Sequence, residues 1–317
     1  MKAVMYHYIR EGMKSLPYFR YLSFKNFKRQ LDYFEKKFGL VTYDEFYTFL
    51  EKPDTYNRIK DKVILTFDDG FSDHYEYVLP ELNRRKTFGF FYIPTGVYNR
   101  KKALDVHRIH FLLGRYGGKF LIDTIQEKIE SEMLIDKHRK EFMNFPYSDQ
   151  DNDFYTQEFK KIFNYYISYD FRESILDTLV YQLSDEDEIF NKMYMTQDQL
   201  KELHKEGMVL GSHSVNHLIF SKLSDEEQYK EIQDSFSFLE RLVGDLYIKS
   251  FCYPYGGFHT FTHKTEEILS QVGCRFSFNV EHRDIEKSDF EKRPQALSRY
   301  DCNYFLYGKA SMGWKVS

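Results

Sequence analysis

The sequence predicts an α/β protein built on parallel strands. Apolar runs typical of buried strands alternate with amphipathic helical segments through most of the chain. The run at residues 62–67 is apolar on both faces, as in the strands of parallel sheets and α/β barrels. Because 317 residues can bury one large core or two smaller ones, we expect a single barrel or two domains.

The composition excludes several classes of protein. Hydrophobic residues make up 42% of the chain and the net charge is −4, with lysines spread over helix faces, so we expect no nucleic-acid partner. The first residues, MKAVMYHYIREG, are too polar for a signal peptide or a transmembrane segment, and we expect a cytoplasmic protein. The three cysteines, Cys252, Cys274 and Cys302, form no CxxC pair, which argues against a disulfide framework and a zinc knuckle.

The first hundred residues predict alternating strands and helices. Ser23 can cap a helix that Gly39 ends, and Pro80 is expected to interrupt the helix after Gly70. The predicted elements are a strand at 2–8, helices at 24–38 and 43–50, the central strand at 62–67, a helix at 73–86 and a strand at 88–93. Strands separated by helices at this spacing should pair in parallel.

The pattern changes between residues 101 and 191, where helical periodicity continues but strand-like runs vanish. We predict an inserted helical lobe at 101–191, between barrel segments 1–100 and 192–317. A lid over the active site is favoured, and a scaffold for oligomer contacts is the alternative. The later predicted elements are helices at 195–207, 224–243 and 262–271, and strands at 208–213, 249–253, 274–278 and 297–301. The strand at 297–301 should be the last in the chain.

Two adjacent carboxylates, Asp68 and Asp69, follow the central strand. Side chains alternate along a strand, so the two acids cannot point the same way unless the backbone turns, which Gly70 permits. One pocket could then use the two acids in different roles. Taken alone, this stretch is equally compatible with a strand that ends in a solvated Asp-Asp-Gly turn.

Two histidines at i,i+4 spacing, His213 and His217, follow the strand at 208–211 and should lie at the same end of the sheet as the acids. An HxxxH pair alone is more often surface or core than a metal site. One carboxylate with two imidazoles suits one divalent ion, zinc above all, with nickel, cobalt or iron as alternatives. Three protein ligands leave positions open for water and substrate.

The motifs TFDDG, HSVNH and FCYPYGG, in this order, resemble the first three motifs of the polysaccharide deacetylase family, also called NodB-like or carbohydrate esterase family 4. The resemblance spans residues 60–280 without the helical lobe. It implies a distorted (β/α) barrel of the NodB type, a divalent metal and hydrolysis of N-acetyl groups on amino sugars. By the motif match, Asp68 falls on the catalytic base, and Asp69, His213 and His217 fall on the metal ligands.

Further residues are assigned only through this resemblance. Ser214 corresponds to a hydroxyl that stabilises the loop of the second motif. Tyr255 corresponds to the residue whose backbone N–H helps to hold the oxyanion, and Pro254 precedes it at the substrate-binding position.

The chain departs from the family pattern at two positions. Cys252 stands where the third motif usually carries an arginine, and the C-terminal Leu-x-His motif that supplies the catalytic acid is absent. Some branches of the family draw the acid histidine from the N-terminal strand, and MYHYI at residues 5–9 resembles that arrangement, which makes His7 the candidate acid. A core histidine is the alternative for His7. We expect Arg299 to replace the missing arginine and pair with Asp68, with a surface ion pair as the alternative.

These observations predict a metal-dependent carbohydrate N-deacetylase in cell-surface glycan biosynthesis. Its substrate would be an N-acylated sugar that is free, nucleotide-linked or lipid-linked. A catalytically silent member that only binds carbohydrate and a hydrolase of a non-sugar amide are the alternatives. The sugar, the acyl group, the native metal and the oligomeric state stay open.

Overall fold

The computed structural model describes residues 1–126, 128–135 and 152–312, and the chain divides into two compact units. Unit 1 comprises Met1–Glu11, Leu22–Arg100 and Tyr194–Ala310. The described part of unit 2 lies within Gly12–Tyr21, Lys101–Met193 and Ser311–Ser317. Residues 12–21, which the sequence analysis assigned to the barrel, therefore group with the inserted region.

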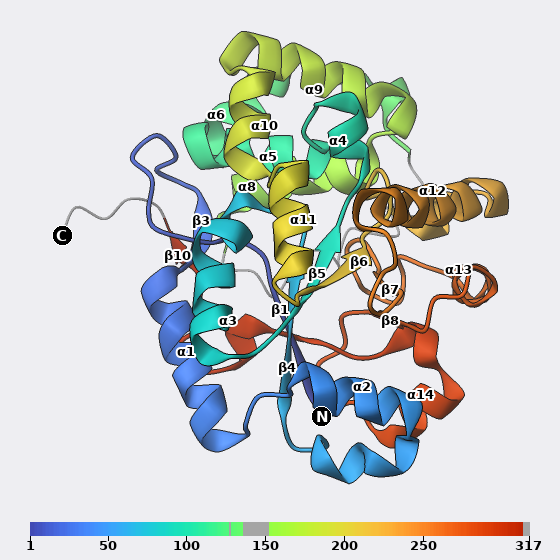
Figure 1. Cartoon of the computed structure of the whole chain (residues 1–317). Helices are drawn as coiled ribbons and strands as arrows, with labels where there is room; N and C mark the ends of the chain where they lie inside the picture. The colour runs from blue at the N-terminus through green and yellow to red at the C-terminus, as the bar shows by residue number, and fades with distance from the viewer. Residues whose placement is uncertain (127, 136–151, 313–317) are drawn as a thin grey trace. The chain divides into compact units, whose positions relative to one another are not determined.

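The core of unit 1 is a sheet of seven strands in the order β8-β7-β6-β5-β4-β1-β9 (Figure 1). The strands are β1 (Lys2–Tyr6), β4 (Val63–Asp68), β5 (Phe90–Ile93), β6 (Val209–Ser212), β7 (Ser250–Cys252), β8 (Phe276–Phe278) and β9 (Tyr300–Asp301). Each neighbouring pair is parallel. All residues of β4 are buried, as expected for a strand covered on both faces. The predicted α/β class and parallel pairing are confirmed.

The segment after β8 curls the sheet towards a barrel. The N–H of Leu297 donates to the carbonyl of Ser277 at 2.8 Å, and Asn279 N–H donates to the Leu297 carbonyl at 2.9 Å. Immediately afterwards, Tyr300 and Asp301 pair with β1. One short segment thus hydrogen-bonds to both β8 and β1, and the sheet is curled into a distorted (β/α) barrel.

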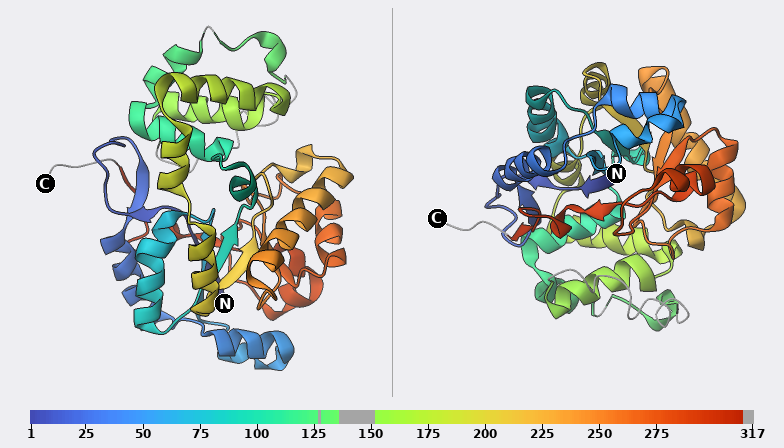
Figure 2. Two further views of the ribbon diagram at one scale, coloured as in Figure 1. Left: turned by 45° about the horizontal axis from the view of Figure 1, so that its top comes forward. Right: turned by 90° about the horizontal axis from the view of Figure 1, so that it is seen from below.

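Helices lie around the strands of unit 1 (Figure 2). Its α-helices are α1 (Phe24–Lys37), α2 (Tyr43–Glu51), α3 (Leu79–Arg85), α4 (Gly96–Arg100), α11 (Gln197–Lys205), α12 (Asp225–Val243), α13 (His263–Gln271) and α14 (Lys287–Lys292). Short helical turns are η1 (Pro53–Arg58), η2 (His74–Val78), η5 (Phe220–Lys222), η6 (Pro294–Ala296) and η7 (Cys302–Tyr304). Ser23 and Ser224 cap α1 and α12 by accepting a backbone N–H of the first turn, which confirms two predicted helix starts.

Two local predictions are wrong. Pro80 does not interrupt a helix, because η2 runs directly into α3 and Pro80 lies in the first turn of α3. A proline is tolerated there, since the first N–H groups of a helix have no partner within it. The strand at 297–301 is also not the last in the chain, because β10 (Ser311–Met312) follows it.

Unit 2 is helical over most of its described residues. Its helices are α5 (Asp105–Tyr116), α6 (Gly118–Ile125), α8 (Phe154–Lys161), α9 (Tyr169–Leu183) and α10 (Glu186–Met193), with the turns η3 (Ser131–Met133) and η4 (Ile162–Tyr166). Strand β3 (Arg20–Ser23) pairs with β10 through Arg20 and Tyr21, and its last two residues pair with β2 (Ile9–Arg10). A search of the described helices for one long and apolar enough to cross a membrane finds none.

Candidate metal and catalytic site

The carboxyl ends of the strands in unit 1 bring the predicted residues together. Asp68 is the last residue of β4 and Asp69 follows it. His213 follows β6, and Cys252 is the last residue of β7. Arg299 directly precedes β9, in the segment that joins β8 to β1. Parallel pairing therefore delivers residues from distant parts of the sequence to one edge of the sheet.

The backbone at this edge adopts conformations that most residues avoid. Asp69 has φ 77°, and Ser214, His217 and Tyr255 have φ values of 62°, 54° and 63°. A positive φ costs a non-glycine residue about 1–2 kcal/mol. Such residues gather at functional sites, where the surrounding structure holds them in place. The turn at Asp69 continues through Gly70 at φ 65°, so the backbone turns after the first acid, as the sequence analysis allowed for Gly70.

Asp69, His213 and His217 form a compact group of metal-ligand type. Asp69 Oδ1 lies 3.5 Å from Nε2 of His213 and 3.5 Å from Nε2 of His217. All three residues are buried, and their potential ligand atoms lie within 4.8 Å of one another. A tetrahedral ion bound at about 2.0–2.1 Å places neighbouring ligand atoms roughly 3.3–3.4 Å apart. The residues present therefore fit one divalent ion.

Hydrogen bonds around the imidazoles favour the same arrangement. The Nδ1–H of His213 donates to the carbonyl of Cys252 at 2.7 Å, which leaves the Nε2 lone pair facing Asp69. Burial lowers the pKa of His213, against the opposing effect of Asp68 and Asp69, so the ring is neutral at pH 7. The Ser214 hydroxyl accepts the backbone N–H of His217 at 3.0 Å, as expected for the residue that stabilises this loop.

Asp68 makes a buried, two-pronged ion pair with Arg299. Nη1 of Arg299 lies 2.8 Å from Oδ1 of Asp68, and Nη2 lies 2.8 Å from Oδ2. The side chain of Arg299 also donates from Nη1 to the Thr66 hydroxyl at 3.0 Å. The two members of the pair are 1% and 2% exposed, so the contact is not the surface ion pair considered as the alternative.

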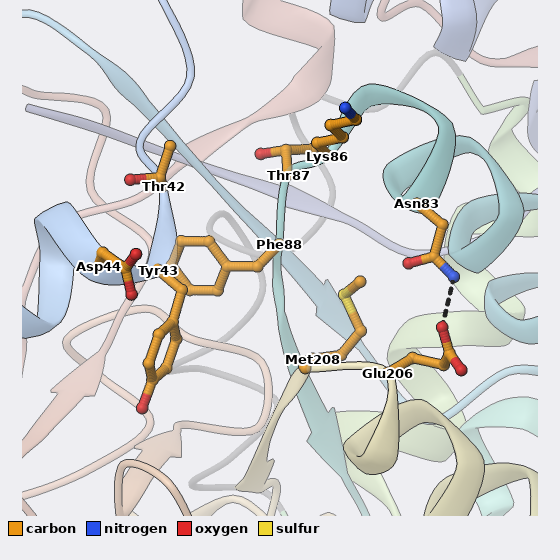
Figure 3. A pocket seen from close by; sticks show the side chains of 10 residues that line it. Thr42, Tyr43, Asp44, Asn83, Lys86, Thr87, Phe88, Glu206 and Met208 are labelled. Carbon is orange, nitrogen blue, oxygen red and sulfur yellow. Dashed lines mark hydrogen bonds between the residues drawn. The ribbon is translucent and has the colours of Figure 1, made fainter.

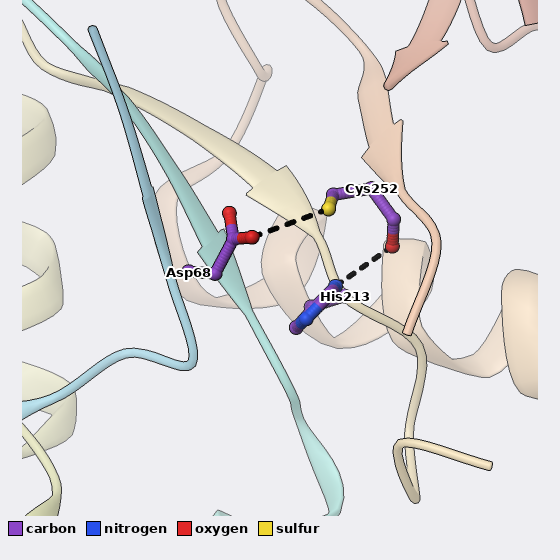
Figure 4. A group of neighbouring side chains, drawn as sticks. All are labelled: Asp68, His213 and Cys252. Atoms are coloured by element: carbon purple, nitrogen blue, oxygen red, sulfur yellow. Dashed lines mark hydrogen bonds between the residues drawn. The ribbon is translucent and has the colours of Figure 1, made fainter. Parts of the chain in front are cut away.

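Cys252 completes the surroundings of Asp68 (Figure 4). Its sulfur lies 3.5 Å from Oδ2 of Asp68 and 2.8 Å from Nη2 of Arg299. Burial raises the pKa of Cys252 well above its ordinary value, so the thiol stays protonated and can donate to the carboxylate. Burial also raises the pKa of Asp68, but the adjacent guanidinium, together with the nearby histidines, more than offsets this effect and the pKa lies below its usual value.

His7 and Tyr255 lie beside the metal-ligand group. Nε2 of His7 is 3.9 Å from Oδ2 of Asp69, and its side chain is 40% exposed. A side chain with this exposure is not a core histidine, which was the alternative role for His7. The backbone carbonyl of His7 accepts from the buried ring of His74 at 2.8 Å. Tyr255 follows Pro254, and its ring centroid lies 5.0 Å from that of His217.

Sequence reasoning missed three side chains that surround this site. The sequence gives Cys252 no role beyond the place of a missing arginine, and Thr66 counts only as part of the apolar strand. Thr66 and Asp68 share one face of β4 at i,i+2, and this spacing was the available signal. Glu231, on α12, accepts the backbone N–H groups of Val215 and Asn216 at 3.0 and 2.8 Å. No motif in the sequence singled it out.

A cavity of about 410 Å³ lies elsewhere in unit 1 (Figure 3). Its lining includes Phe88 and Met208, which precede β5 and β6, together with Asn83 and Glu206, joined by a 3.0 Å hydrogen bond. It therefore lies at the amino ends of the strands, opposite the edge that carries Asp68 and His213. It is separate from the candidate site.

The fold and the side chains at its strand ends define a barrel of the NodB type. The family model described as polysaccharide deacetylase matches residues 180–277, which include the HSVNH and FCYPYGG motifs. This match confirms the resemblance of these motifs to the polysaccharide deacetylase family. A comparison with curated protein sequences gives no match.

Solved structures support the fold. A Streptococcus pyogenes deacetylase, PplD, in complex with acetate, is similar with a TM-score of 0.56 and 16% identity over 95% of this chain and 91% of that one. IcaB from Ammonifex degensii is similar with a TM-score of 0.54 and 18% identity over 95% and 90% of the two chains. The deacetylase domain of BpsB from Bordetella bronchiseptica has a TM-score of 0.50 and 12% identity, over 94% of each chain. At these identities the likeness establishes the fold alone.

Proposed function

We propose that the protein is a metal-dependent hydrolase that removes an N-acyl group, acetyl above all, from an amino sugar or sugar conjugate in cell-surface glycan biosynthesis. The observation that carries the proposal is that two sets of residues lie side by side at the carboxyl edge of the sheet. Asp69, His213 and His217 have the chemistry and spacing of metal ligands. Asp68, one residue away, is held by Arg299 instead of joining that group.

A divalent metal ion would be held by Asp69, His213 and His217. When bound, a divalent ion supplies Lewis acidity, which polarises the amide carbonyl and makes water easier to deprotonate. Zinc suits this set of one carboxylate and two imidazoles, and nickel, cobalt or iron are the alternatives. The zinc ligands of known hydrolases commonly comprise three protein side chains with one position left for water.

Asp68 is suited to take the proton of the attacking water. Its Oδ2 accepts from both Arg299 and Cys252, whereas Oδ1 accepts only from Arg299 among the residues that the structure describes. A carboxylate oxygen has two acceptor sites, so Oδ1 keeps capacity for the water. The guanidinium keeps the carboxylate ionised and fixes its orientation, which is the part usually played by the arginine whose position Cys252 occupies.

The other residues have roles that follow from the family resemblance and from their positions. His7 would donate a proton to the departing amine, and the backbone N–H of Tyr255, next to Pro254, would help to hold the oxyanion. The chain leaves and re-enters unit 1 between β5 and β6, whose carboxyl ends border the site. We propose on this ground that unit 2 acts as a lid.

Alanine at any one of Asp69, His213 or His217 should strip the ion from the purified protein. Each substitution removes one of three protein ligands, and two are too few to retain the metal. Elemental analysis of the three single variants, with Asp73→Asn as a buried acid outside the group, checks this. Full metal occupancy in all three would exclude the ligand set.

Replacing His7 by glutamine should lower kcat strongly while metal content and melting temperature stay close to those of the unmodified protein. Glutamine fills similar space but cannot donate a proton to the amine, so the alkaline limb of the pH–rate profile should also disappear. Kinetics from pH 5 to 9 check this. Full activity, or a large drop in melting temperature, would mean that His7 is not the acid.

The function itself is tested with a substrate panel. The metal-loaded chain would be incubated with free N-acetyl sugars, nucleotide-linked N-acetyl sugars and short oligosaccharides, and acetate release measured against the metal-stripped chain. Metal-dependent acetate release supports the proposal. Sugar binding without release would indicate a silent carbohydrate-binding member, and release from simple amides alone would indicate a non-sugar hydrolase.

A further inference from the structure

The loop at residues 213–217 is held on one side by a buried acid on α12. Oε2 of Glu231 accepts the backbone N–H groups of Val215 and Asn216 at 3.0 and 2.8 Å. Its Oε1 accepts from the side-chain amide of Asn216 at 2.5 Å. Glu231 is 8% exposed, so these are hydrogen bonds of a buried carboxylate to neutral donors, which are stronger than bonds between neutral groups.

The same loop is held on its other side by the turn between β5 and α4. The N–H of Thr95 donates to the carbonyl of Ser214 at 3.0 Å, and the N–H of Gly96 donates to that of Val215 at 2.9 Å. A Cβ on Gly96 would lie 2.7 Å from the Val215 carbonyl oxygen, so glycine is needed for this close approach. The peptide groups between the two histidines are therefore bound from two directions.

These hydrogen bonds fix the part of the loop that joins His213 to His217. Val215 and Asn216 lie between Ser214 and His217, and Ser214 and His217 both have a positive φ. The loop also borders a cavity of about 450 Å³ lined by α4 and α12, with Glu231 in its wall.

We propose that Glu231 is a positioning residue that fixes the 213–217 loop in the conformation needed to bring both imidazoles to one metal ion. It touches neither the ion nor the substrate, and it acts through Val215 and Asn216. The role depends on the reach and geometry of its two oxygens. The inference rests on the proposed function, because it assigns Glu231 to the same metal group.

The test is the affinity of the full chain for Co²⁺, read from the visible absorption spectrum of the bound ion. Glu231→Ala should bind Co²⁺ about 10–100-fold more weakly, as is typical when a residue that supports metal ligands is removed. Glu231→Gln should stay closer to the unmodified protein, since its oxygen can accept both backbone N–H groups and a turned Asn216 amide can accept from its nitrogen. Glu231→Asp keeps the charge but is one methylene shorter, so it should bind weakly.

Asp234→Asn is the matched control, because Asp234 is an exposed acid one turn further along α12 that pairs with Lys230. It should leave Co²⁺ affinity and spectrum unchanged. If Glu231→Ala does not fold, Glu231→Asp and Glu231→Gln decide the test. The proposal would be overturned if Glu231→Asp bound Co²⁺ more tightly than Glu231→Gln. Co²⁺ affinities within twofold of one another in all variants would also overturn this proposal, but they would leave the proposed function intact. An unmodified chain that takes up no Co²⁺ would overturn both.

Discussion

Replacing Asp68 by asparagine should lower kcat about 10²–10⁴-fold while the metal content of the protein stays unchanged. Asparagine has nearly the same shape but cannot take a proton from water at neutral pH. Asp68 is bound to Arg299 and Cys252 and is not needed for the group of Asp69, His213 and His217. Steady-state kinetics with the substrate found in the panel, together with elemental analysis of the same preparation, check both parts.

The matched control is Asp69→Asn, which changes the neighbouring acid and should lose the metal together with activity. A second arrangement of potential ligands, Asp68, His213 and Cys252, also exists in the structure. If that group held the ion, Asp68→Asn would lose metal as well as activity. Loss of metal would therefore reverse the roles of the two acids, and an active Asp68→Asn variant would mean that another group is the base.

The sequence predicted the parts of the site that are local in the chain. β4 and β6 are apolar runs with a clear beginning and end, so the positions of Asp68 and His213 at strand ends could be inferred from pattern alone. The i,i+4 spacing of His213 and His217 lies within a single loop. The family resemblance then supplied roles that pattern could not.

The surroundings of Asp68 could be predicted only in part. Its contact with Arg299 joins residues 231 positions apart, and it depends on how the segment after β8 closes onto β1. β9 is two residues long, too short for hydrophobic periodicity to define. The absence of the usual arginine suggested that another would replace it, but the donor from Cys252 had no such signal, because a cysteine in an apolar strand looks like core.

The division of the chain shows another limit of pattern reading. The sequence predicts an insertion at 101–191 because strand runs stop there, and Lys101–Met193 belongs to the second compact unit. Gly12–Tyr21 groups with the same unit, yet nothing in its composition differs from its neighbours. Its place depends on contacts such as that of Tyr18 N–H with the Gly114 carbonyl at 2.8 Å, which link distant segments.

Replacing Arg299 by methionine should lower the free energy of unfolding strongly and should shift the pH dependence of activity. Removing one partner of a buried ion pair typically costs about 3–5 kcal/mol, because the other charge is left buried without compensation. With the guanidinium gone, burial is free to raise the pKa of Asp68 above its ordinary value. A base must be ionised to act, so the acidic limb of kcat/KM should move to higher pH.

The sign of the effect on stability follows from the same pKa. In the unmodified protein the pKa of Asp68 is lowered on folding, so its contribution to stability is present above the unfolded pKa of about 3.9 and is lost as the pH falls through the folded value. In Arg299→Met the folded pKa lies above the unfolded one, so stability should decline as the pH rises from about 4. Urea unfolding between pH 4 and 8 should therefore show a difference between the two proteins that grows with pH, and Arg299→Met/Asp68→Asn should remove that growth because no carboxylate is left to ionise. A difference that is the same at every pH would show that Arg299 stabilises the fold by packing and does not control the ionisation of Asp68.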